Sequence, residues 1–195
     1  MQKLGGIEMR NNLVRKLVLS GLFIALVFLA TYFTRIPTPL PGGYFNLGDA
    51  VIMLAAVFLG PVGGMIAGGI GSAFADMAAG ALIFAPITLV VKGIEGLVVG
   101  LIATKYRRNY LETRRTSPFN MNLILALIVG ALIIAAGYFA GEAFILSLFD
   151  SAFGLIAAAG ELPTNLTQGA LSAILGYVLV LLLNNAGAGV FKNNK

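Results

Sequence analysis

The fold is decided by residues 47–80, which read LGDAVIMLAAVFLGPVGGMIAGGIGSAFADMAAG. As a single helix this stretch would be about 50 Å long, whereas a bilayer core is only about 30 Å thick. Gly60 and Pro61 interrupt the stretch, and proline is well placed in the first turn of a helix but poorly placed in its interior. We therefore predict two short helices, 47–60 and 61–80, joined by a tight turn.

The composition of the whole chain indicates a membrane protein. Hydrophobic residues make up 58% of the 195 residues and charged residues 11%, whereas an ordinary soluble domain has roughly 25% charged residues. So few charges leave too little polar surface for a water-facing globule, so lipid must be the solvent. The sequence has no cysteine and no histidine, which argues against a zinc, copper or haem site. We expect no metal, no cofactor and no enzymatic activity.

The uncharged stretches and the basic residues together predict the topology. We expect one all-α membrane domain over residues 1–195, with a flexible N-terminus (1–12) and six transmembrane helices at about 13–34, 47–60, 61–80, 86–104, 120–148 and 163–185. Eleven of the thirteen Lys and Arg residues precede the first uncharged stretch, which begins at Leu17, lie between 105 and 115, or close the chain. The positive-inside rule places all three groups in the cytoplasm. The chain must therefore cross the membrane an even number of times between one basic group and the next. This requires two crossings within residues 47–80 and puts both termini inside. It also explains the basic residues without a nucleic-acid partner.

Polar residues within the predicted spans gather at one depth. Each lies in the outer half of its predicted helix, or in the loop that precedes it, and ionisable groups at membrane depth indicate function by default. The candidate ligand contacts are Tyr44, Asn46, Asp76, Lys92, Glu95, Glu142, Asn165 and Gln168.

Some of these residues have a structural alternative. Lys92 and Glu95 are three apart on one helical face and can pair locally, or Asp76 can neutralise Lys92 from another helix. For Asn165 and Gln168 we favour ligand contact, because a buried amide with unmet hydrogen bonds is costly. Asp49 is instead typical of a helix start, where the positive end of the helix dipole favours an acid.

The segment between the first two spans, residues 35–46, contains three prolines and therefore cannot be helical. We expect it to be extended and to lie over the mouth of the polar cluster. It is either a lid with Gly42 and Gly43 as its hinge or an ordinary connection.

Five motifs together carry a resemblance to a known family. They are GYFNLGD (43–49), LGPVGG (59–64), GGIGSAFAD (68–76), APITLVVKGIEG (85–96) and ELPTNLTQG (161–169). On these motifs the chain, over about residues 14–183, resembles the substrate-binding S components of energy-coupling factor (ECF) vitamin transporters.

The resemblance implies a six-helix, multi-pass protein of the bacterial plasma membrane that binds a vitamin near its outer face. Its partners would be a transmembrane coupling protein and two ATPase subunits, and the family's small-residue docking motif corresponds to Gly21 and Ala25. Because Asp49, Asp76, Glu95 and Glu142 outnumber the single base, the cluster favours a neutral or cationic ring over an anion. This ranks a pyridoxine-like or hydroxymethylpyrimidine-like vitamin first, riboflavin next and pantothenate lower.

A second class of function remains open. The buried carboxylates could form an ion relay in a stand-alone secondary transporter, although no inverted repeat is evident in the sequence.

Overall fold

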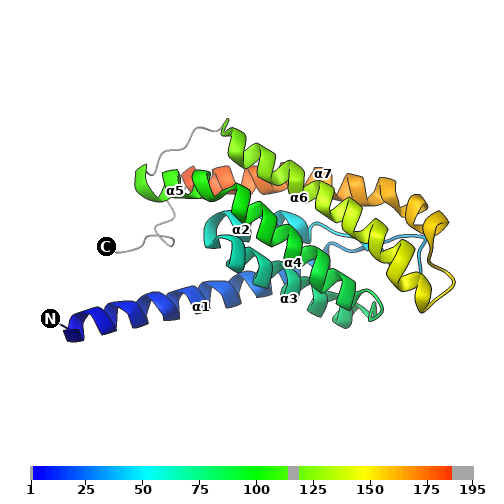
Figure 1. Cartoon of the computed structure of the whole chain (residues 1–195), viewed down its shortest axis with the longest axis horizontal. Helices are drawn as coiled ribbons and strands as arrows, with labels where there is room; N and C mark the ends of the chain where they lie inside the picture. Colours follow the sequence, from blue (N-terminus) through cyan, green and yellow to red (C-terminus); the bar gives the residue numbers. More distant parts are fainter. Residues whose placement is uncertain (1, 114–118, 186–195) are drawn as a thin grey trace.

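A computed structural model describes residues 2–113 and 119–185, and this part of the chain is an elongated helical bundle with one short β-hairpin (Figure 1). The helices are α1 (Gln2–Phe33), α2 (Gly48–Leu59), α3 (Pro61–Ala79), α4 (Ala85–Ile102), α5 (Thr104–Thr113), α6 (Met121–Ala140) and α7 (Leu155–Asn185). Helix α6 continues through a π-helical turn, η1 (Gly141–Ile145), and a 3-10 turn, η2 (Leu146–Leu148). The all-α prediction is confirmed for these residues.

Five of the described helical segments are long and apolar enough to cross a membrane: Val14–Phe33, Pro61–Ala79, Ala85–Ile102, Met121–Leu148 and Leu155–Asn185. The remaining predicted span, 47–60, corresponds to α2, which is apolar but has only 12 residues and is therefore about 18 Å long. Its residues 52–58 are all buried, so α2 is a core helix surrounded by its neighbours.

The predicted break at Gly60-Pro61 is confirmed. Gly60 both ends α2 and begins α3, with a φ of +88° that L side chains rarely adopt, and Pro61 occupies the first turn of α3. Arg107 of α5 donates from Nε to the Phe58 carbonyl oxygen at 3.2 Å. The arginine therefore satisfies a carbonyl group that the end of α2 leaves without a helical partner.

Glycines on α3 allow its backbone to touch that of α4. A methyl group at Gly68 would lie 2.6 Å from the Lys92 carbonyl oxygen, and one at Gly69 would lie 2.8 Å from that of Leu89. Gly71 approaches α1 in the same way, at 2.7 Å from the Ile24 carbonyl oxygen. The small residues of this segment thus serve packing within the chain, as small-xxx-small patterns do in membrane helices.

Three boundaries differ from the prediction. Helix α7 begins at Leu155 rather than Pro163, because a membrane helix can accommodate an internal proline whose freed carbonyl finds other partners. Helix α1 begins at Gln2, so residues 2–12 continue the helix where a flexible terminus was expected. Residues 105–113, which lie between two predicted spans and were expected to be a loop, belong to α5, in which Tyr106 and Tyr110 are buried.

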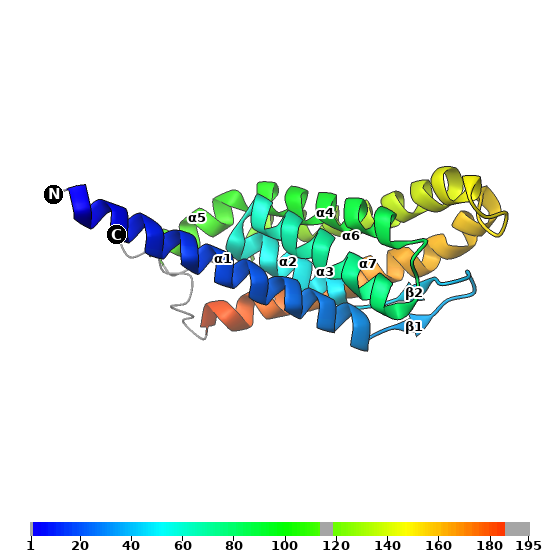
Figure 2. The same cartoon turned by 90° about the horizontal axis from the view of Figure 1, so that it is seen from below.

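The proline-rich segment is extended, as predicted. Strands β1 (Ile36–Pro37) and β2 (Tyr44–Phe45) pair antiparallel, with Ile36 opposite Phe45 and Pro37 opposite Tyr44. Figure 2 shows this hairpin at one end of the bundle, whereas the start of α1, α5 and the end of α7 lie toward the other end.

This arrangement predicts opposite labelling of two single cysteines in an otherwise cysteine-free chain. Pro39 in the hairpin and Arg108 in α5 are both exposed. An impermeant maleimide applied to intact cells should label Pro39→Cys and should reach Arg108→Cys only after the cells are opened. Labelling of Arg108→Cys in intact cells would contradict the proposed orientation.

Candidate functional site

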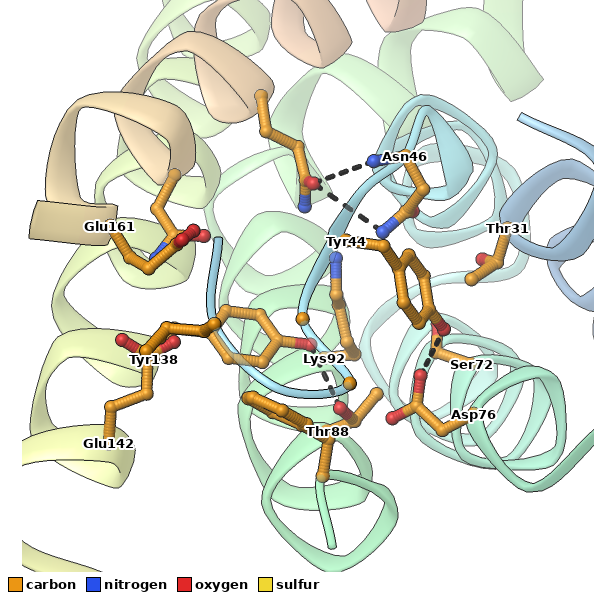
Figure 3. A pocket seen from close by; sticks show the side chains of 16 residues that line it. Thr31, Tyr44, Asn46, Ser72, Asp76, Thr88, Lys92, Tyr138, Glu142 and Glu161 are labelled. Atoms are coloured by element: carbon orange, nitrogen blue, oxygen red, sulfur yellow. Dashed lines mark hydrogen bonds between the residues drawn. The ribbon is translucent and has the colours of Figure 1, made fainter. Parts of the chain in front are cut away.

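A pocket lies beneath the β1–β2 hairpin, at the hairpin end of the bundle (Figure 3). Its wall comes from α1, the hairpin segment, α3, α4, the end of α6 and α7. The polar residues that line it are Thr31, Tyr44, Asn46, Ser72, Asp76, Thr88, Lys92, Tyr138, Glu142, Glu161, Asn165 and Gln168.

An ion pair and an amide organise the floor of the pocket. Lys92 on α4 and Asp49 on α2 form a salt bridge, and neither side chain is more than 1% exposed. The other carboxylate oxygen of Asp49 accepts a hydrogen bond from Nε2 of Gln168 on α7 at 2.8 Å. The Oε1 atom of Gln168 in turn accepts the backbone N–H of Asn46 at 2.8 Å. This chain of contacts joins the hairpin segment to three helices.

Tyr44 closes one side of the pocket. Its hydroxyl donates a hydrogen bond to Oδ1 of Asp76 on α3. Burial, together with the negative charge of Asp76, raises the pKa of the Tyr44 hydroxyl, so this phenol stays neutral and remains a donor. The second oxygen of Asp76 is buried and has no hydrogen-bond partner in the described chain.

The opposite side of the pocket carries a second acidic group (Figure 3). Glu142, in the π-helical turn, and Glu161, on α7, are 4% and 6% exposed and close enough for their charges to repel. Asn165 lies beside Glu142, yet its Nδ2 and Oε2 of Glu142 make no hydrogen bond of ordinary geometry with any described residue. Buried polar atoms of this kind are costly unless something else satisfies them.

Aromatic rings and hydroxyl groups complete the lining. Tyr138 and Thr88 share a hydrogen bond of 3.0 Å, and the Lys92 ammonium lies 5.5 Å from the centre of the Tyr138 ring. The hydroxyl groups of Thr31 and Ser72 are buried and find no partner among residues 2–113 and 119–185. The pocket therefore offers flat apolar surfaces together with unused donors and acceptors.

The pocket is narrow in this conformation. The volume of the cavity is about 30 Å³. One water needs about 10–15 Å³ on this measure. A ring compound can therefore enter only if the hairpin or the lining side chains move.

Residues 11–185 match the family described as "ECF-type riboflavin transporter, S component". The match covers most of the chain and includes every residue of the pocket. The chain belongs to this family.

Relatives of this S component occur in several organisms. It is 36% identical to an "uncharacterized protein in gap 3'region" from Pyrococcus woesei over 157 residues, which are 78% of this chain and 93% of the relative. It is 30% identical to a UPF0397 protein from Streptococcus agalactiae over 129 residues, which are 65% of this chain and 70% of the relative.

The structure brings seven of the eight candidate ligand contacts together at the pocket. Glu95 does not line it: this side chain is fully buried below the floor, and the charge of Asp49 acts on it. The partner of Lys92 is Asp49, rather than Glu95 or Asp76 as the sequence alternatives had it. Asp49 does lie in the first turn of α2, as expected.

Sequence reasoning missed several residues of the S component's pocket. Glu161 and Tyr138 were both overlooked, although a signal existed for each. Glu161 is a charged residue in an apolar helix whose start was placed too late, and Tyr138 precedes Glu142 by four residues and therefore shares its helical face.

Gly21 and Ala25 lie outside the pocket, on an exposed face of α1. A side chain added at Gly21 would meet nothing within 4 Å among the described atoms. The docking role of this pair stays a prediction, and the open space leaves room for a partner helix to approach.

Removing one partner of the buried ion pair should cause a large loss of stability, and removing both partners should restore much of it. Asp49→Asn leaves the buried Lys92 charge without its ion-pair partner, which should lower the free energy of unfolding by about 3–5 kcal/mol. Thermal unfolding in detergent, followed by circular dichroism, measures the loss. The double variant Asp49→Leu/Lys92→Met removes both charges and should recover much of it. An Asp49→Asn protein as stable as the parent would show that the pair does not hold the floor together.

Proposed function

We propose that this S component is the high-affinity vitamin-binding subunit of an ECF importer, and that its ligand is a neutral or cationic vitamin with a single ring. A pyridoxine-like or hydroxymethylpyrimidine-like compound is the first candidate. The observation that carries this proposal is the buried pocket itself, in which donors and acceptors on α1, α3, η1 and α7 lack partners within the described chain.

The charges of the pocket support a ligand that is not an anion. Asp76, Glu142 and Glu161 line it, and its one basic residue, Lys92, is already balanced by Asp49. An anionic vitamin would meet net repulsion in a low-dielectric site, whereas a protonated ring nitrogen or an amino group would find acceptors.

The shape of the pocket supports a small ring. Tyr44, Phe84 and Tyr138 line it, and aromatic faces of this kind stack on planar rings. The narrow space requires less movement for one ring than for the three fused rings of riboflavin. Riboflavin is nevertheless the second candidate, because the description of the matching family names it.

Import by this subunit would depend on partner proteins. The glycine run 68–71 lacks the Gly-Lys-Ser/Thr ending of a phosphate-binding loop, so ATP hydrolysis would come from the two ATPase subunits through the coupling protein. With both termini in the cytoplasm, the pocket would face the cell exterior. Family membership favours this reading over an ion relay in a stand-alone transporter.

Amide and acid variants test the site. Asn165→Ala removes a buried donor that makes no hydrogen bond of ordinary geometry within the described chain, so it should weaken vitamin binding by about 1–3 kcal/mol, roughly tenfold or more. Glu142→Gln should reduce the affinity of a cationic vitamin strongly and that of a neutral one mildly. Isothermal titration of the purified protein with pyridoxine, hydroxymethylpyrimidine, riboflavin and pantothenate measures both effects.

The matched control is Asn122→Ala. Asn122 lies in the first turn of α6, at the end farther from the pocket, so this variant should bind the vitamin as the parent does. If no vitamin in the panel binds, or if Asn165→Ala binds as tightly as the parent, the proposed pocket is wrong.

The partner surface is tested by a bulky residue on α1. Gly21→Leu should reduce vitamin uptake and co-purification with the coupling protein, because it blocks close approach of a second helix. Gly21 is ten residues from Thr31, about 15 Å along the helix, so binding to the isolated subunit should not change. Ala136→Leu, an equally bulky change at an exposed position of α6, is the control. Normal uptake by Gly21→Leu would remove the docking assignment.

A further inference from the structure

A second and wider hollow lies on the other side of Tyr44. We call it the outer groove: it is bounded by the end of α1, the β1–β2 hairpin and the turn between α3 and α4, with lining residues drawn from 32–44 and 79–81. The volume of the outer groove is about 590 Å³. This is within the range of small-molecule sites and far above the 30 Å³ of the inner pocket.

The outer groove contains one charged side chain, Arg35. Its guanidinium carbon lies 4.0 Å from the centre of the Tyr32 ring and 5.8 Å from that of Tyr44. Its Nε donates to the Tyr32 carbonyl oxygen at 2.7 Å. These contacts fix the plane of the guanidinium group.

The groove offers Arg35 no acidic partner. Among the described residues, no Asp or Glu lines the groove, and the salt bridge found within residues 2–113 and 119–185 joins Lys92 to Asp49 instead. Asp76, whose charge interacts with that of Arg35, is hydrogen-bonded to the Tyr44 hydroxyl and does not line the groove. The terminal nitrogens of a fixed guanidinium form a planar fork that matches phosphate and carboxylate oxygens.

A second polar group supports a ligand site. Thr38 is among the residues that line the groove, and its Oγ1 atom, buried close to Gly43, has no hydrogen-bond partner in the described chain. Around these two groups the wall is apolar or aromatic, with Phe33, Pro37 and Tyr44 among its members. A flat ring that carries an anionic group would satisfy both kinds of surface.

Tyr44 therefore separates two chambers of opposite charge. Its hydroxyl side belongs to the acidic inner pocket and its ring borders the outer groove with Arg35. We infer that the outer groove is a separate binding site for a phosphate ester, in which Arg35 and Thr38 hold the phosphate and the aromatic wall holds a ring. Phosphorylated aromatic compounds would bind there, while the acids beyond Tyr44 exclude them from the inner pocket.

The binding test uses pyridoxine 5′-phosphate, with pyridoxine and inorganic phosphate as comparison probes, on the purified full chain in neutral detergent. Arg35→Gln should weaken pyridoxine 5′-phosphate binding tenfold or more, and Arg35→Lys should weaken it less because it keeps the charge. Thr38→Val, which keeps the shape of the side chain, should weaken it several-fold. Asn122→Ala, at the start of α6 and outside both the inner pocket and the outer groove, should leave it unchanged.

Unchanged binding in both Arg35→Gln and Thr38→Val, or no binding of pyridoxine 5′-phosphate to the parent, would overturn the inference. A phospholipid headgroup presents the same phosphate chemistry, so the titration is repeated in nanodiscs of phosphatidylglycerol and of phosphatidylcholine. Loss of probe binding in phosphatidylglycerol alone identifies lipid as the source of the phosphate; equal binding in both identifies a soluble ester.

The inference rests on the proposed function only for the vitamin nature of the ring. The two can therefore fail separately. If the vitamin panel does not bind but pyridoxine 5′-phosphate binds in an Arg35-dependent way, the proposed function is wrong and the outer groove stands. If vitamins bind and the phosphate ester does not, the proposed function stands and the inference about the outer groove is wrong.

Discussion

The salt bridge between Lys92 and Asp49 is the contact on which the pocket depends. Both side chains are buried away from water. A buried ammonium or carboxylate group without a counter-charge would be very costly. Asp49 also holds Gln168, which holds the backbone of Asn46. The charge of one lysine thus fixes the relative positions of α2, α4, α7 and the segment that leads into the hairpin. Such a chain works only if every member is satisfied.

The groups above this floor are arranged differently, because they are not satisfied. Ser72, Thr31 and one oxygen each of Asp76 and Glu142 are buried without partners within the described residues. A buried donor or acceptor with no partner costs stability, and binding sites accept this cost because a ligand can supply the missing bonds. The polar groups of the floor are hydrogen-bonded to one another and hold the pocket together, whereas the unpaired groups of the wall would bind the ligand.

Close backbone packing makes this arrangement possible in a small bundle. Gly64, Gly68 and Gly69 let α3 lie directly against α4, with contacts to carbonyl oxygens that any side chain would block. The two helices can therefore present Asp76 and Lys92 to one small space. The exposed glycine of α1, Gly21, has no such neighbour, and this contrast distinguishes glycines that pack inside the subunit from one that is free to meet a partner.

The sequence by itself determined the membrane class, the break at Gly60-Pro61 and the depth at which polar residues gather. These follow from hydropathy, from the backbone restrictions of Gly and Pro and from charge placement, all of which act locally. It could not determine which acid pairs with Lys92, because i,i+3 spacing favoured Glu95 and only the packing of α2 against α4 brings Asp49 closer. Glu161 was left out for a different reason: its signal, a charge in an apolar helix, was overlooked because Pro163 was taken as the start of that helix. The tertiary structure decided these points, and it alone showed that Tyr44 lies between an acidic pocket and a basic groove, because only the folded chain brings Asp76 of α3 to its hydroxyl and Arg35 to its ring.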